Sequence, residues 1–146
     1  MTTMTIQDAS RRSGLSEPTL RYYEDIGLIG PIAREAASKH RRYCEQDLDT
    51  LQMLSCLRSM GVGIEDMRIY QANRALGSTA AGEQRDLLTR HAQRVEREIK
   101  TLQIHLEYLR VKAQLWDARE RGNSADEARA KQQIENMIPG LQAVMR

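Results

Sequence analysis

The sequence predicts a mainly α-helical chain, with short helices and a small β-hairpin first, then one long helix and a short C-terminal helix. Three observations predict this class. Short helical segments separated by glycines fill the first half, and apolar residues recur every seven positions in the second half. Only six of the 146 residues, one Trp and five Tyr, are aromatic. So few aromatic residues disfavour a large β-sandwich core.

Composition limits the class further. Apolar residues are 40% and charged residues 29% of the chain, with a net charge of +2, which is typical of a folded protein. That balance excludes a histone-like basic tail and an acidic low-complexity protein. No window of about 18 apolar residues predicts a membrane span, and Met1 to Ser10 lacks a signal-peptide pattern. We therefore expect a cytoplasmic protein, without membrane contact, whose two cysteines are free thiols.

The first two helices are predicted from their ends. A short helix over Ile6 to Ser13 stops at Gly14, a residue favoured just after a helix. Ser16 is a good N-cap for a second helix, from about Glu17 to Asp25, which Gly27 stops. A short helix, a glycine turn and a capped second helix form a helix-turn-helix.

A small β-wing follows in the prediction. Leu28 to Ala33 and Lys39 to Cys44 are expected to be extended around a loop of small residues, Arg34 to Ser38. Two further helices are then predicted, over Gln46 to Gly61 and Ile64 to Ala75.

The second half predicts a coiled coil. From Glu83 to about Glu120 the apolar residues follow an a/d heptad pattern, and between Leu88 and Trp116 the helix would extend about 42 Å, at ~1.5 Å per residue. This seam would lie in water unless a second copy or another part of the chain covers it, and the segment after Gly122 is too short to do so. We therefore expect a homodimer. The seam residues are Leu88, Ala92, Val95, Ile99, Leu102, Leu106, Leu109, Ala113 and Trp116.

The C-terminal segment is predicted to form one short helix. Ser124 is the expected N-cap, with Glu127 completing a capping box, and the helix should end at about Met137, before Pro139-Gly140. The last residues, 141–146, are expected to be loosely ordered. We divide the chain into a winged helix-turn-helix domain (1–76), a dimerisation helix (77–121) and a C-terminal tail (122–146).

Spacing alone makes DNA binding one of two open interpretations. The second helix of a helix-turn-helix enters the major groove through N-terminal and outward side chains, here Ser16, Glu17, Thr19, Arg21 and Tyr22. The predicted wing holds the densest basic cluster, Lys39, His40, Arg41 and Arg42, suited to the DNA backbone or minor groove. Residues 1–58, however, carry eight basic and eight acidic side chains, so their net charge is zero. The alternative is a plain helical hairpin with solvated arginines.

Several separated motifs resemble the MerR family of bacterial transcription regulators. The resemblance begins with TIQDASRRSGLSEPTLRYYEDIGLI (Thr5 to Ile29). It continues in the family's order through RRYCEQDLDTL (Arg41 to Leu51), LRSMGVGIEDM (Leu57 to Met67) and the heptad helix. It spans about residues 4–119 and favours the DNA-binding interpretation.

The resemblance implies a winged helix-turn-helix domain and an antiparallel coiled-coil homodimer without a cofactor or enzymatic activity. Such dimers bind double-stranded promoter DNA with an overlong spacer and distort it so that RNA polymerase engages when an effector is present. The protein would thus be nucleoid-associated. Positions matching the family's DNA contacts are Ser16, Thr19, Arg21 and Tyr22 on the recognition helix, Arg41, Arg42 and Tyr43 in the wing, and Arg58 in the third helix.

The effector is left open by the residues. Metal-sensing relatives carry cysteines at the start of the dimer helix and in a following loop. This chain has only Cys44 and Cys56, so no metal site is expected. His91 and His105 are interpreted as surface or seam-flanking residues. Resemblance to the electrophile- and aldehyde-responsive branch (AdhR and NmlR type) instead points to Cys56, in Ser55-Cys56-Leu57-Arg58, as a sensor whose thiolate the Arg58 cation would favour.

Other interpretations of these residues stay open. Cys56 is alternatively a small, semi-buried apolar residue. A non-covalent ligand site is possible around Tyr108, Trp116 and a tail containing Ile134, Met137, Ile138 and Leu141, although those residues would equally cover the end of the coiled coil. A coiled-coil interaction module that binds no DNA is the remaining functional alternative.

Overall fold

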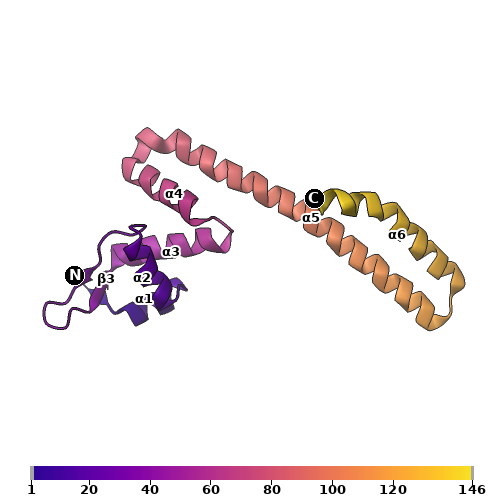
Figure 1. Ribbon diagram of the computed structural model, residues 1–146, viewed down its shortest axis with the longest axis horizontal. Helices are drawn as coiled ribbons and strands as arrows, with labels where there is room; N and C mark the ends of the chain where they lie inside the picture. The colour runs from indigo at the N-terminus through magenta and orange to yellow at the C-terminus, as the bar shows by residue number, and fades with distance from the viewer. Residues whose placement is uncertain (1, 146) are drawn as a thin grey trace. The chain divides into compact units, whose positions relative to one another are not determined.

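The structure is a computed structural model that describes residues 2–145. The chain forms two compact units divided between Leu88 and Thr89. In Figure 1 the first unit is coloured from indigo through magenta, and the second unit is coloured from orange to yellow.

Helices α1 (Ile6–Ser13) and α2 (Glu17–Asp25) begin and end where the sequence predicts. Gly14 adopts a left-handed φ of 79° and its N–H donates to the carbonyl of Ser10 at 2.9 Å, which closes α1. The Ser16 hydroxyl accepts a hydrogen bond from the N–H of Thr19 at 3.2 Å and caps α2. The caps thus fix the turn between the two helices.

The core of the first unit lies where α1, α2 and α3 (Glu45–Ser59) meet, and α4 (Ile64–Leu76) and the short 3₁₀ helix η1 (Gly77–Ala80) follow (Figure 1). The inward residues Leu20 and Tyr23 anchor α2, being only 0% and 2% exposed. Because α2 is anchored by one side, its opposite side is free to face a ligand. The largest fully buried side chains are Tyr43, Leu20, Leu48, Leu51, Leu54 and Met67.

A three-stranded antiparallel sheet of order β1-β3-β2 completes this unit. Strand β3 (Arg41–Cys44) lies between β1 (Thr3–Met4) and β2 (Ala33–Arg34). The prediction of extended structure over Leu28 to Ala33 is wrong for all but Ala33, because the apolar residues Leu28, Ile29 and Ile32 are drawn into the helical core. Strand β1 was not predicted.

The second unit is a helical hairpin. Helix α5 (Ala81–Arg121) contributes its residues from Thr89 onward, and α6 (Ser124–Val144) runs back beside it (Figure 1). Val111 and Leu115 of α5 are buried against Ala130, with Ile134 and Met137 of α6 packed around them. This packing holds α6 on one face of α5.

The predicted boundaries of the last helix are wrong at both ends. Asn123 is the N-cap, with its side-chain oxygen accepting from the N–H of Asp126 at 3.0 Å, so Ser124 is the first helical residue. Helix α6 also passes through Pro139 and continues to Val144, so residues 141–144 are helical. A proline lacks an N–H and so removes one backbone hydrogen bond of the helix, but its fixed φ of about −65° is compatible with helical geometry. Arg146 lies outside the described residues.

Among residues 2–145, no helix is both long enough and apolar enough to cross a membrane.

Candidate nucleic-acid interface

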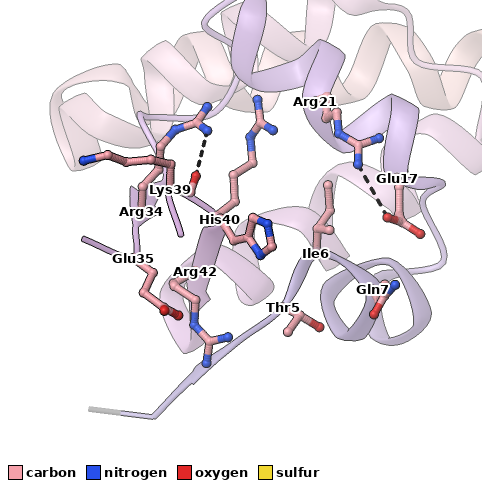
Figure 2. Close-up of a pocket in the computed structure, with 11 residues that line it drawn as sticks. Thr5, Ile6, Gln7, Glu17, Arg21, Arg34, Glu35, Lys39, His40 and Arg42 are labelled. Atoms are coloured by element: carbon pink, nitrogen blue, oxygen red, sulfur yellow. Dashed lines mark hydrogen bonds and ion pairs between the residues drawn. The ribbon is translucent and has the colours of Figure 1, made fainter. Parts of the chain in front are cut away.

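A groove of about 390 Å³ separates the N-terminal part of α2 from the wing, which comprises β2, β3 and the loop of residues 35–40. Figure 2 shows Glu17 and Arg21 of α2 on one side and Arg34, Lys39, His40 and Arg42 of the wing on the other. Six of the eleven lining residues are basic in type and only two, Glu17 and Glu35, are acidic. Basic groups are therefore gathered here although residues 1–58 have no net charge.

The α2 side of the groove presents polar and cationic groups. The Arg21 guanidinium is 3.6 Å from the Glu17 carboxylate, and both side chains are substantially exposed. Tyr22 is 51% exposed, with its ring tilted against that of buried Tyr23. The hydroxyls of Ser16 and Thr19 are hydrogen-bonded to each other at 2.8 Å. An exposed arginine, tyrosine and hydroxyls on one helix are groups that bind phosphates and base edges.

The wing side is cationic and well supported. Arg42 is held by β1, because its Nε donates to the hydroxyl of Thr3 at 3.2 Å. Arg34, which the sequence interpretation omitted, donates from Nη1 to the carbonyl of Lys39 at 3.1 Å and so braces the loop. Lys39 itself has a φ of 64°, a left-handed conformation that turns the loop back toward β3.

Two of the wing residues expected to touch DNA are engaged elsewhere. Tyr43 is 0% exposed and belongs to the core, so a direct contact between its side chain and DNA is incompatible with this structure. Burial raises the pKa of Tyr43. The side chain of Arg41 is only 17% exposed and its Nε lies 2.6 Å from Oε1 of Glu24. The sequence does not predict the pairing of Arg41 with Glu24 of α2, because the two residues are 17 positions apart.

Arg58, on α3, is exposed and lies close enough to Tyr23 for its positive charge to act on the Tyr23 hydroxyl. Burial raises the pKa of Tyr23, although the Arg58 cation acts in the opposite direction. The guanidinium therefore lies beside α2.

Helix α5 has two apolar faces. Leu102, Leu109 and Trp116 are 64%, 63% and 62% exposed, whereas Val111 and Leu115 are buried against α6. Two residues along a helix correspond to a rotation of roughly 200°, so the heptad seam and the face that α6 covers are on opposite sides. The structure therefore shows that α6 does not cover the seam.

The remaining candidate residues are scattered. Cys56 is exposed on α3, and Cys44 is half-buried at the N-cap of that helix. Trp116 lies under the Arg119 guanidinium, 4.6 Å from its ring centroid, and the Lys112 ammonium lies 5.7 Å from that of Tyr108. Within the described part of the chain, no three His, Cys, Asp or Glu side chains come together as metal ligands would.

The helix-turn-helix, the basic groove and the wing together define a helix-turn-helix regulator of transcription. Residues 4–74 match the MerR HTH family regulatory proteins. The HTH-type transcriptional regulator HmrR of Sinorhizobium medicae (strain WSM419) is 35% identical over 100 residues, which cover 68% of this chain and 67% of that protein. AdhR of Bacillus subtilis (strain 168) is 33% identical over 92 residues, covering 63% of this chain and 65% of that regulator.

Solved structures agree. The crystal structure of HiNmlR, a MerR family regulator lacking the sensor domain and bound to promoter DNA, superimposes with a TM-score of 0.71 and 27% identity. The match covers 83% of this chain and 92% of that chain. This chain therefore belongs to the MerR family, and it is a DNA-binding transcriptional regulator rather than an enzyme.

Proposed function

We propose that the protein acts as a homodimer that binds a promoter through the groove between α2 and the wing and regulates transcription in response to an effector. The observation that carries this proposal is the groove itself, where Arg21 of α2 faces Arg34, Lys39 and Arg42 of the wing. Acting there, the protein would be nucleoid-associated.

The recognition helix would read the major groove. Ser16 is the N-cap of α2, and Thr19, Arg21 and Tyr22 follow on the helix; base-reading residues of a helix-turn-helix are the N-terminal and outward ones of the second helix. Arg21 can donate to a phosphate or to guanine O6 and N7, and the exposed Tyr22 hydroxyl can donate to a phosphate. Lys39 and Arg42 would hold the DNA backbone from the wing, and Arg58 would add a phosphate contact beside α2.

The seam on α5 would pair two copies. Its exposed leucines and Trp116 lie on the face that α6 leaves uncovered, and that face would lie in water in a single chain. Pairing presents two recognition helices, as two half-sites require. Distorting an overlong spacer costs a few kcal/mol, and many phosphate contacts from both copies would offset that cost while RNA polymerase engages.

Titration of promoter DNA at two salt concentrations tests the DNA-binding part. We expect Arg21→Ala and Arg42→Ala to weaken binding without unfolding the protein, and Arg42→Ala to reduce the slope of log affinity against log salt by about 1. The matched control is Arg129→Ala on α6, which removes the same charge outside the groove. Wild-type binding without salt dependence or sequence preference would refute the proposal, and the coiled-coil interaction module would replace it.

We further propose that the effector is an electrophile, aldehyde or oxidant sensed at Cys56. Exposure of Cys56 supports this hypothesis because a reagent can reach the thiol. Cys56→Ser should abolish induction by electrophiles, whereas Cys44→Ser, which changes the half-buried thiol at the helix cap, should not.

Unchanged induction in the Cys56→Ser variant would refute the thiol hypothesis and favour a non-covalent ligand. The exposed ring of Trp116 with Arg119 above it is the feature that favours such a site in the second unit. Some relatives are named as heavy-metal-dependent regulators. We propose no metal sensing of that kind for this chain, because both of its cysteines precede α4.

A further inference from the structure

Glu24 lies in the last turn of α2, and its carboxylate is turned to the wing. Oε2 accepts a hydrogen bond from the backbone N–H of Ile32 at 2.8 Å, and Oε1 accepts one from Nε of Arg41 at 2.6 Å. Ile32 immediately precedes β2 and Arg41 begins β3. One carboxylate on the recognition helix therefore holds both strands of the wing hairpin.

The Glu24 carboxylate is well placed to fix the position of the wing hairpin relative to α2. The Glu24 and Arg41 side chains are only 14% and 17% exposed, so their pairing is partly shielded from water. The neighbouring residue Tyr23 is buried in the core, which makes this turn of α2 a rigid support. Partial burial pushes the pKa of Glu24 upward, but hydrogen bonds from Arg41 and Ile32 outweigh it and leave the pKa below its ordinary value. Glu24 is thus ionised at neutral pH.

Strand β3 is anchored by its pairing with β1 and by the buried side chain of Tyr43, but β2 and its loop have few supports of this kind. Strand β2 contains only two residues, both exposed, and its register with β3 is limited to Ala33 opposite Arg42 and Arg34 opposite Arg41. The loop of residues 35–40 is exposed throughout. The position of β2 and the loop of residues 35–40 relative to α2 therefore depends strongly on Glu24.

We propose that Glu24 is a positioning residue for DNA binding, which sets the wing cations Arg34 and Lys39 at the spacing from α2 that the DNA requires. This inference rests on the proposed function, because it assumes that both sides of the groove contact one duplex. Glu24 itself makes no contact with DNA in this account.

Simple electrostatics predicts the opposite effect. A carboxylate near DNA repels phosphates, so neutralising it should strengthen binding. If Glu24 positions the wing, neutralising it weakens binding, because the wing cations lose their alignment with the backbone. The sign of the change therefore distinguishes the two accounts.

The experiment measures the affinity of the full-length protein for a fluorescent duplex that the wild type has selected from a randomised library. We expect Glu24→Gln to weaken binding by about tenfold or more and to reduce the salt slope by about 1 to 3, for the phosphates contacted from the wing. Asp25→Asn is the matched control, since it removes the same charge from the adjacent exposed residue, and it should bind as the wild type or more tightly. Binding by Glu24→Gln as tight as the wild type would overturn the inference.

A double-mutant cycle separates positioning from a general loss of structure. Glu24→Gln and Arg41→Gln should be strongly non-additive, because each removes the same pairing, and additive effects would overturn the inference. If circular dichroism shows that Glu24→Gln does not fold, Glu24→Asp replaces it. That variant keeps the charge but is one methylene too short to reach both partners, and wild-type affinity in it would equally overturn the inference. A wild-type protein that selects no duplex refutes the proposed function itself.

Discussion

Replacing Leu109 by alanine should weaken the dimer by about a hundredfold. Leu109 is 63% exposed in the single chain, so roughly two thirds of its surface remains to be buried at the seam. Truncation removes three carbon groups at ~0.8 kcal/mol each, about 2.4 kcal/mol, of which about 1.5 kcal/mol applies to the exposed part. The residue occurs twice in a symmetric dimer, which gives about 3 kcal/mol, or roughly a hundredfold in the dimer dissociation constant.

The assay is sedimentation equilibrium over a dilution series. The control is Leu115→Ala, on the same helix but 4% exposed and packed against α6. It should lower the free energy of unfolding by about 2 to 5 kcal/mol while changing dimerisation much less. If Leu109→Ala leaves the dimer dissociation constant unchanged, the assignment of the seam is refuted.

Three further predictions concern the first unit. Ser16→Ala should lower the free energy of unfolding in urea by about 1 kcal/mol, because the Thr19 N–H loses its cap; an unchanged midpoint contradicts this. Gly14→Ala should lower the free energy of unfolding by about 1 to 2 kcal/mol, because alanine is strained at the Gly14 φ of 79°. A variant that is more stable than the wild type in the same assay would refute the left-handed turn. The pKa of Glu24 is lower in the folded protein than its ordinary value of 4.5, so the ionised carboxylate stabilises the fold at pH values above 4.5. This contribution is lost as the pH falls through the pKa of Glu24 in the folded protein. The stability gap between wild type and Glu24→Gln should therefore close in acid, and a gap independent of pH would contradict the pairing.

Local signals predicted the elements that are stabilised locally. The ends of α1 and α2 follow from Gly14 and the Ser16 cap, because those interactions span only a few residues. The heptad pattern likewise predicted α5. The sequence does not predict strand β1, because a strand of two residues shows no periodic pattern. Its pairing with β3 also joins positions that are about 40 residues apart.

The same distinction explains the candidate site. Arg21, Lys39 and Arg42, which the sequence assigns to DNA contacts on the second helix and the wing, line one groove in the structure. Tyr43 was assigned to DNA although it is buried, since a motif position does not reveal which way a side chain of β3 faces. Glu24 was missed because its partners, Ile32 and Arg41, are 8 and 17 residues away.

The second apolar face of α5 shows a further limit. The seven-residue repeat explains the exposed seam, but Val111 and Leu115 belong to the opposite face, whose partner is α6.

The stoichiometry of the complex with a selected duplex tests the central claim most directly. Light scattering after size-exclusion chromatography measures the mass of that complex. Two copies of this chain on one duplex are predicted, since the α5 seam pairs two copies of the α2 and wing groove. A complex containing a single chain per duplex would contradict the account.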